Sequence, residues 1–516
     1  MTDREWDAMD EFELDELLRD SMSELPPEDV VTEVTPWKRA MKRVLVGLAL
    51  CTVTLNFWCL DYILPSIGMV LALLGFRTLR HENHWLRNCF IITVIRCTYF
   101  FPFLILNTMP IQSTVYASSV MQVLTVINLG LQFAQFFSLW RGLRAIQEKS
   151  GLPPGAGGAL ALLVWFAFIC LLALVQYSGL LIAGIMIVGY FFILRSLWKL
   201  SKELDEAGYA VQTAPVKVPD LAVAITISAV LFIGCACGYL FGGRYPMDWN
   251  EMSATEHDSV EEIKEHLLGL GFPEYVLNDL TAEEITACEG ALQIVVDVYD
   301  HPANEGRRVT TKEPGKPGSG VDWRYITRTV YDEKELRITG IGVQIPGERE
   351  QWIIIQHFLW TINPGFYGTE SIQLWPPYNH HSEGWGSAGD VTGRVLYDRD
   401  GVTYAAPYYS LGEQTFTSNN IFFGEQTSTD VFATFSMPRS GENHRGYVVY
   451  PIIEMQDGWI TDCWINYTHQ RTWMQYPAVT AVEKRMTTGM NNAGAFFTVQ
   501  DALQFYSTDE GAKLIN

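Results

Sequence analysis

The stretch "WKRAMKRVLVGLALCTVTLNFWCL", residues 37–60, decides the fold class, because basic residues crowd its start and charge then disappears. A secretory signal peptide also has a basic start and an apolar core, but a small-residue cleavage site ends it. Here the basic start follows 36 other residues, and "NFWCLDYILP" stands where a cleavage site is expected. The stretch is therefore predicted to remain in the protein as the first of several membrane spans.

Further apolar blocks follow this one, and a helix needs about 20 residues to cross a bilayer. About seven membrane-spanning helices are predicted, at 43–59, 62–77, 88–107, 116–140, 158–177, 179–198 and 219–242. The first two blocks are short and Asp61 separates them, so they are expected to form a tight hairpin. A bilayer is thus the first predicted partner.

The distribution of lysine and arginine predicts the orientation of these spans. Basic residues precede the first block and fill the links after the second, fourth and sixth, whereas the links around Asp61, 108–115 and 177–180 contain none. Cytoplasmic loops carry the excess of lysine and arginine in membrane proteins. The N-terminus is therefore predicted on the cytoplasmic side of the membrane, with the C-terminal half outside.

An acidic arm, residues 1–36, precedes the spans. Its first 35 residues hold thirteen Asp and Glu against Arg4 and Arg19, and the whole chain has a net charge of −22, which argues against nucleic-acid binding. An apolar stripe of an amphipathic helix is formed by Leu14, Leu17, Leu18 and Met22. Such a helix suits a groove on a cytoplasmic regulatory protein. A solvated tail, or a helix folded back on the basic loops, are the alternatives.

Polar residues also occur inside the predicted membrane domain, residues 37–242. Arg96 lies in the middle of the third block, and one helix face of the fourth carries Thr125, Asn128, Gln132 and Gln135. Such groups must meet protein or water, because lipid offers no hydrogen bonds. They form either contacts between helices or the lining of a path for a small molecule or ion.

Residues 243–300 read as an extracytoplasmic helical hairpin. Ser259 with Glu262, and Thr281 with Glu284, fit the capping-box pattern of a helix start. Glycines at 269 and 271, followed by Pro273, mark the break between the helices.

Residues 301–516 read as a β-rich domain. Strand-like runs include "LRITGIGVQI", "QWIIIQHFLWTI", "TESIQLW", "RVLY", "VTYAAPYY", "DVFATFSM", "GYVVYPIIEM" and "WITDCWINYTH". Asp400-Gly401 and Asp457-Gly458 are typical of hairpin turns. The predicted fold is thus a membrane α-helical bundle followed by an extracytoplasmic α+β domain with an antiparallel β-sandwich or jelly-roll-like core.

The most unusual stretch of the β-rich domain is "WPPYNHHSEGWGSAGD", residues 375–390. Its aromatic and histidine residues form a candidate ligand site for a protein, peptide or glycan: Trp375, Tyr378, His380, His381 and Trp385. The same histidines with Glu383 and Asp390 could hold a metal, but adjacent loop histidines are more often exposed polar residues, so no metal or cofactor is predicted. No catalytic motif is found, and the protein is not expected to be an enzyme.

Nine cysteines occur in the chain, and only Cys288 and Cys463 fall in the predicted outer half. A disulfide between these two is one reading if that half is outside the cell, and two free thiols are the other.

The block "VTPWKRAMKRVLVGLALCTVTLNFWCLDYILPSIGMVLALLGFR" resembles the start of uncharacterised multispan membrane proteins of Gram-positive bacteria. The layout of acidic arm, spans and outer domain is also similar to that of membrane-bound anti-sigma factors. The resemblance implies a location in the bacterial cytoplasmic membrane and a cytoplasmic regulatory partner for the arm. The zinc-binding His/Cys motif of many anti-sigma domains is absent from residues 1–40, and seven spans exceed the usual one, so the two layouts differ there.

The chain has a soluble region on each side of the predicted spans and no catalytic motif, which favours a function as a sensor or regulator. The outer β domain would bind an envelope ligand or protein, and the arm would engage a cytoplasmic partner. An envelope binding or scaffold protein with a membrane anchor is the alternative, and a transporter component is the third hypothesis.

Overall fold

A computed structural model describes residues 36–52, 59–175, 179–209, 211, 218–253, 259–304, 306–314, 323–380, 384–420, 424–472, 476–486, 494–508 and 510–515. The chain divides into two compact units. One comprises Met1–Leu106 and Ser113–Cys235, and the other Asn107–Gln112 and Ala236–Asn516. The arm residues singled out in the sequence, Leu14 to Met22, lie outside the described residues.

The N-terminal half is helical. Its helices are α4 (Pro36–Thr52), α5 (Leu60–Leu79), α6 (His84–Leu106), α7 (Gln112–Ala117), α8 (Ser119–Lys149), α9 (Gly157–Leu174), α10 (Leu180–Glu206) and α11 (Asp220–Gly242). Among the described residues, six of them (α5, α6, α8, α9, α10 and α11) are long and apolar enough to cross a membrane. The prediction of about seven is therefore corrected to six: α4, described over 17 residues with a basic start, is not among these helices.

Helices α4 and α5 form the hairpin that the first two apolar blocks predict. Glycines allow their backbones to touch: a Cβ on Gly47 would lie 2.7 Å from the carbonyl oxygen of Gly68, and one on Gly75 would lie 2.8 Å from that of Ala40. Because the contacts run in opposite directions along the two helices, the pair is antiparallel. Small residues at such contacts are typical of helix packing in membranes.

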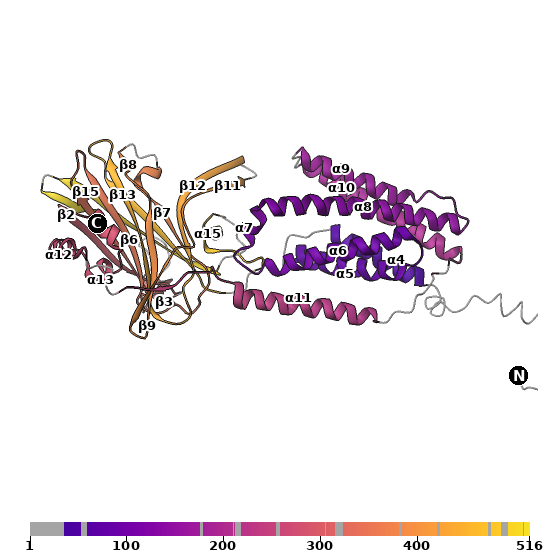
Figure 1. The fold of residues 1–516 in the computed structure, drawn as a ribbon, viewed down its shortest axis with the longest axis horizontal. Coiled ribbons are helices and arrows are strands. Elements are labelled where there is room, and N and C mark those ends of the chain that lie inside the picture. Colours follow the sequence, from indigo (N-terminus) through magenta and orange to yellow (C-terminus); the bar gives the residue numbers. More distant parts are fainter. Residues whose placement is uncertain are drawn as a thin grey trace, which may run out of the picture. The chain divides into compact units, whose positions relative to one another are not determined.

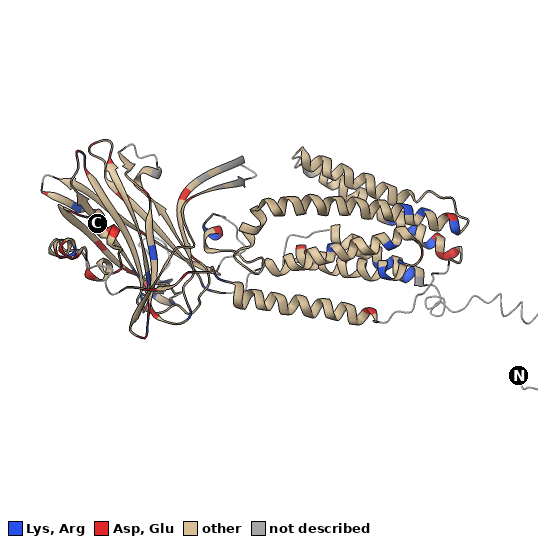
Figure 2. Ribbon diagram, in the orientation of Figure 1, with Lys and Arg blue, Asp and Glu red and all other residues tan. Residues whose placement is uncertain are grey.

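Basic residues gather at one end of the helices (Figure 2). Asp220 at the start of α11 accepts from two of them, Arg43 of α4 at 2.5 Å and Arg77 of α5 at 3.3 Å. The start of α4, the end of α5 and the start of α11 therefore lie at the same end of the bundle.

The C-terminal half is rich in antiparallel sheet (Figure 1). The larger sheet has the order β1-β10-β9-β13-β6-β5-β2, with β8 also paired to β13. Its strands are β1 (Asn250–Glu251), β2 (Gln293–His301), β5 (Leu336–Ile345), β6 (Gln351–Trp360), β8 (Trp385–Ser387), β9 (Thr392–Arg399), β10 (Val402–Pro407) and β13 (Glu442–Glu454).

The smaller sheet has the order β11-β12-β7-β14-β15-β16. Its strands are β7 (Glu370–Trp375), β11 (Ser410–Asn420), β12 (Gly424–Phe435), β14 (Thr461–Gln470), β15 (Phe496–Thr508) and β16 (Gly511–Leu514). A separate hairpin joins β3 (Arg307–Pro314) to β4 (Trp323–Val330). Two short helical segments lie among these strands, η1 (Pro377–His380) and α15 (Ala481–Met486).

A hydrophobic core lies between the two sheets. Trp352, Phe358 and Tyr450 enter it from the larger sheet, and Phe435 and Tyr467 enter it from the smaller one. Alternate residues of each strand point to this core, as the period of two in a strand requires.

A helical cap covers the other face of the larger sheet. It consists of α12 (Glu261–Gly269), α13 (Glu274–Leu277) and α14 (Ala282–Ala287) and shares a second apolar core with that sheet. The capping box of Thr281 and Glu284 is confirmed at the start of α14. The one expected at Ser259 is not formed, because α12 begins at Glu261 and its N-cap residue is Val260.

The two Asp-Gly pairs have different roles. Asp400 and Gly401 both have positive φ and form the hairpin turn between β9 and β10, as predicted. Asp457-Gly458 links β13 of the larger sheet to β14 of the smaller one, so the expected hairpin there is wrong. A hairpin requires its flanking strands to pair, and β13 pairs with β6, β8 and β9 instead.

Candidate functional site

Two ionisable residues occupy core-facing positions at one end of the smaller sheet. Along β14 the core-facing residues are Cys463, Ile465 and Tyr467, and His469 is the next position of the same parity. Glu370, the first residue of β7, lies directly opposite His469 in the strand pairing. The alternation that buries the apolar residues thus also buries this pair.

The histidine and the carboxyl group bond to each other. His469 Nδ1 lies 2.7 Å from Glu370 Oε1, and Glu370 is fully buried. Burial raises the pKa of Glu370 above its usual value, while His469 acts in the opposite direction. The bond fixes the imidazole ring, so its Nε2 atom is the one left to face a ligand.

Aromatic residues surround the pair. The Trp360 ring, at the end of β6, meets the His469 ring at 5.0 Å and an interplanar angle of 62°. The Trp360 indole donates to the Tyr467 hydroxyl at 2.9 Å. These contacts hold His469 between the two sheets.

A cavity of about 390 Å³ opens beside His469. Its walls come from the ends of β6 and β14 and from the neighbouring loops: Ala303, Asn304, Glu335, Trp360, Ile362, Asn363, Pro364, Gly365, Phe366, His469 and Arg471. Hereafter these residues are called the His469 pocket. All of them belong to the second unit.

Several polar groups of the pocket are engaged within the protein. Glu335 accepts from the backbone N–H of Ala303 at 2.8 Å and from the Asn304 amide. Asn363 donates to the carbonyl of Gly441 and contacts His444 Nδ1 at 3.1 Å. Among the described residues no hydrogen bond to His469 Nε2 is found.

The pocket combines a fixed histidine, a guanidinium and an indole face. A histidine held by a carboxyl group can accept or donate a proton. Among the described lining residues there is no serine, threonine or cysteine that this histidine could activate. No group of three or more metal-ligating side chains occurs in the described part of the chain. The chemistry of the lining suits reversible binding of a small polar molecule.

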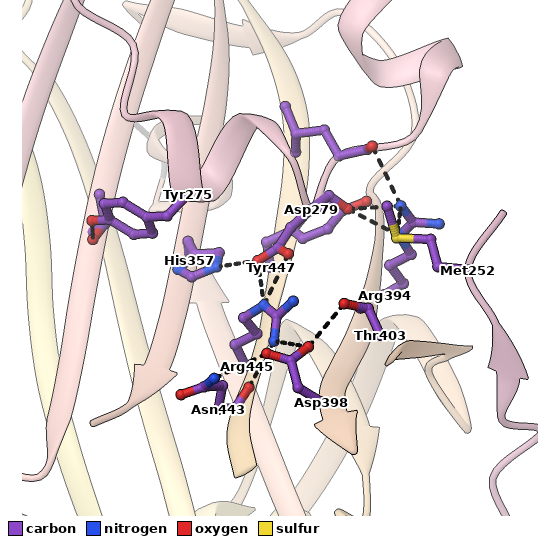
Figure 3. Close-up of polar contacts among 12 residues, drawn as sticks. Met252, Tyr275, Asp279, His357, Arg394, Asp398, Thr403, Asn443, Arg445 and Tyr447 are labelled. Carbon is purple, nitrogen blue, oxygen red and sulfur yellow. Dashed lines mark hydrogen bonds and ion pairs between the residues drawn. The ribbon is translucent and has the colours of Figure 1, made fainter. Parts of the chain in front are cut away.

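A second buried polar cluster fastens the helical cap to the larger sheet (Figure 3). Arg445 of β13 donates from Nε to both oxygens of Asp279 at 2.9 Å and from Nη1 to Asp398 at 2.9 Å. His357 Nε2 of β6 lies 2.9 Å from Asp279 Oδ2. Burial opposes the charge of Arg445, but the two carboxylates outweigh it and raise its pKa.

Two further contacts complete this attachment. Arg394 of β9 donates to the carbonyl of Asp279 at 2.8 Å. Glu284, besides closing its capping box, accepts from the Tyr447 hydroxyl at 2.5 Å and from Thr392 at 2.7 Å. Because Asp279 and Glu284 of the cap are both bonded to strands of the larger sheet, we assign this cluster a structural role.

The aromatic stretch that the sequence singled out is spread over several environments. Trp385 is buried in the core between the sheets and donates to the carbonyl of Ile460 at 3.2 Å. Tyr378 packs against the same core, and Trp375 faces Trp464 with ring centroids 6.5 Å apart. The side chain of His380, and all of His381 and Glu383, lie outside the described residues.

The polar residues of the helical unit partly come together. Arg96 donates to Gln135 at 2.6 Å and to Asn128 at 3.4 Å, and Gln135 donates to Thr93 at 2.9 Å. Thr125 instead bonds within its own helix, to the carbonyl of Met121 at 2.9 Å. Gln132 is half-buried on α8. Arg96 of α6 thus contacts α8 through two side-chain hydrogen bonds.

Cys288 and Cys463 are both free thiols in separate cores. Cys288 lies between the cap and the larger sheet, and Cys463 lies between the two sheets. Burial raises the pKa of each thiol to about 12, which leaves both unreactive. The structure does not join them in a disulfide.

Sequence reasoning missed Glu370 and His469. The available signal was that both occupy the core-facing parity of apolar strands, in "TESIQLW" and "WITDCWINYTH". A titratable residue at a buried position is expensive and needs a partner. Glu370 and His469 are 99 residues apart, and nothing in the sequence indicated that each would be the partner of the other.

No family model matches the chain, and no curated protein matches it significantly.

Proposed function

We propose that this protein is a membrane-bound sensor or regulator whose β-rich half binds a small ligand in the His469 pocket outside the cell. The observation that carries the proposal is the pocket itself, in which a buried carboxyl group orients an imidazole toward a cavity of about 390 Å³. Ligand pockets of this size combine an apolar wall with a few polar groups that fix orientation.

The lining indicates the chemistry of the ligand. His469 Nε2, when it carries a proton, suits a carboxylate or another hydrogen-bond acceptor, and the indole face of Trp360 suits a flat or apolar part. The guanidinium of Arg471 adds positive charge to the lining. Glu335 is engaged with its own loop, so it offers little to a cation. A small carboxylate with an apolar portion is the ligand class we favour.

The orientation rests on charge. Basic residues lie at the end of the bundle that holds the start of α4 and the start of α11. The excess of lysine and arginine marks the cytoplasmic side. Because α11 leads away from that end, the β-rich half would follow it to the outside, and the acidic arm would remain inside.

Ligand binding is tested with the full chain in detergent. A panel of acetate, benzoate, phenylacetate, glutamate and glucose is added, and the thermal midpoint of unfolding is followed by tryptophan fluorescence. We expect an aromatic carboxylate to raise the midpoint of the wild type and to have little effect on His469→Asn, whose amide keeps the bond to Glu370 but removes Nε2.

The control variant is His266→Gln, which removes an exposed histidine of the helical cap away from the pocket. It should respond as the wild type does. If no compound of the panel stabilises the wild type, or if His469→Asn responds equally, the proposed ligand site is wrong.

Signalling by the arm requires a separate test. A peptide of residues 1–36 is used to capture cytoplasmic proteins. The control is the same peptide with Leu17→Asp and Leu18→Asp, which disrupt the apolar stripe. We expect a partner that the wild-type peptide retains and the altered peptide loses. If no protein is captured, or if the captured protein binds both peptides equally, the arm does not signal in the proposed way. The protein would then be a binding module anchored in the membrane.

A further inference from the structure

The segment that follows α11 is fastened to the β-rich half. The backbone N–H of Tyr245 donates to Ser436 Oγ at 2.9 Å, and the Tyr245 ring stacks on that of Tyr409 at 4.6 Å. These contacts place Arg244 close to Arg439, which follows β12.

Two adjoining cavities flank Arg244, and both are lined only by residues of the second unit. The larger, of about 530 Å³, has mainly apolar and aromatic walls that include Met109, Phe241 and Trp249. The smaller, of about 230 Å³, contains both Arg244 and Arg439. Arg244 and Pro110 line both cavities, so the two form one elongated site.

The charge of this site is unusual for such an acidic chain. Neither lining contains an aspartate or glutamate, although the protein has 58 of them against 36 lysines and arginines. Within the described ranges neither guanidinium has a hydrogen bond or ion pair with a side chain or the backbone. Burial lowers the pKa of Arg244, and the charge of Arg439 lowers it further. Arg244 is half-buried and Arg439 is exposed, so solvent screens part of their repulsion, and an anion bound between them would remove the remainder.

The position of the site along the chain restricts the anion. Helix α11 is long and apolar enough to span a membrane and ends at Gly242, two residues before Arg244. Its last turn exposes apolar side chains, with Phe241 82% and Leu240 57% exposed. A residue just beyond the end of a span lies at the depth of the phospholipid headgroups.

We propose that Arg244 and Arg439 bind the phosphate group of an amphiphile, whose apolar part occupies the larger cavity beside the end of α11. Arginine suits phosphate because its planar guanidinium donates two parallel hydrogen bonds. The phosphate could belong to a membrane phospholipid or to a soluble phosphate ester, and both share this chemistry. The site is independent of the His469 pocket.

The experiment uses the full chain, delipidated in a maltoside detergent that contains no phosphate. Phosphatidylglycerol, diacylglycerol and glycerol 3-phosphate are added separately, and bound molecules are counted by native mass spectrometry. We expect phosphatidylglycerol to bind and diacylglycerol not to bind. Arg244→Gln and Arg439→Gln should each weaken phosphatidylglycerol binding about tenfold or more, as loss of a charged hydrogen bond does.

The matched control is Arg399→Gln, which removes an exposed arginine of the β9–β10 hairpin. It should bind phosphatidylglycerol as the wild type does, and the thermal midpoint of each variant shows whether it is folded. Binding of glycerol 3-phosphate as tight as that of the lipid would support the phosphate site and identify a soluble ester as its ligand. Equal binding of diacylglycerol, or phosphatidylglycerol binding that the Arg244→Gln and Arg439→Gln variants retain, would overturn the proposal.

Discussion

At the scale of single residues, the buried charge of Asp279 is held by specific partners. Asp279 is 2% exposed; its carboxylate accepts a hydrogen bond from Arg445 and lies 2.9 Å from His357 Nε2. Removing one partner of a buried ion pair leaves the other charge uncompensated, which costs far more than the pair itself contributes. The helical cap therefore depends on a few side chains.

Arg445→Met should loosen the cap. The change keeps the length of the side chain but leaves the Asp279 carboxylate buried without its guanidinium, at a cost of about 3–5 kcal/mol. We expect faster hydrogen–deuterium exchange across residues 261–287 in the full chain, measured by mass spectrometry of peptides.

The control for this prediction is Arg307→Met. Arg307 pairs with Asp332, and both side chains are about two-thirds exposed, at 65% and 64%. Exposed pairs contribute about 0–1 kcal/mol, so exchange across the cap should not change. If hydrogen–deuterium exchange across the cap is also unchanged in Arg445→Met, the apolar contacts alone are enough to hold the cap on the sheet.

His444 should make stability depend on pH. Burial lowers its pKa below the usual 6.5, an effect that neighbouring Arg445 increases and the Pro438 carbonyl and Asp398 oppose. The folded protein therefore holds His444 neutral. This contribution is complete above the unfolded pKa and is lost as pH falls through the lowered folded pKa.

Thermal unfolding of the wild type and of His444→Gln measures this effect. Between about pH 8 and about pH 5 the wild type should lose more stability than the variant, because only the wild type takes up this proton on unfolding. Parallel pH profiles for the two proteins would contradict the assignment.

At the scale of elements, close backbone contact holds α4 to α5. A side chain at Gly68 would meet the Gly47 carbonyl at 2.7 Å and the Cys51 sulfur at 2.8 Å. Backbone atoms cannot move aside as the end of a flexible side chain can. Gly68→Val should therefore separate the hairpin and lower the thermal midpoint of the detergent-solubilised protein, at a cost of about 1–3 kcal/mol.

Gly130→Val on α8 is the matched control, because nothing lies within 4 Å of a Cβ at that position. It places the same β-branched side chain in another apolar helix. If both variants have the wild-type midpoint, the close contact of α4 with α5 contributes nothing measurable.

At the scale of the whole molecule, the orientation in the membrane is the property on which the proposed function depends. Two exposed positions test it in cells that express the full chain: Lys202→Cys at the basic end of α10 and Asp457→Cys between β13 and β14. A membrane-impermeant maleimide should label Asp457→Cys in intact cells and Lys202→Cys only after permeabilisation. The reverse pattern would place the β-rich half in the cytoplasm and remove the basis for an outer ligand.

The local pattern of the sequence determined most elements. Apolar blocks of sufficient length predicted the spans, and the run "LRITGIGVQI" coincides with β5. Both signals depend on neighbours along the chain, which is why they can be read from the sequence. The exposed hairpin of β3 and β4 escaped prediction because its residues are largely exposed and show no alternation of apolar and polar positions.

The tertiary structure alone decided the partition of strands between sheets and the composition of the sites. Asp457-Gly458 has the composition of a hairpin turn, but pairing with distant strands sent β13 and β14 to different sheets. The bond of Glu370 to His469 and the meeting of Arg244 with Arg439 likewise join residues far apart in the chain. Sequence periodicity records which face of an element is buried, whereas only long-range packing determines what that face meets.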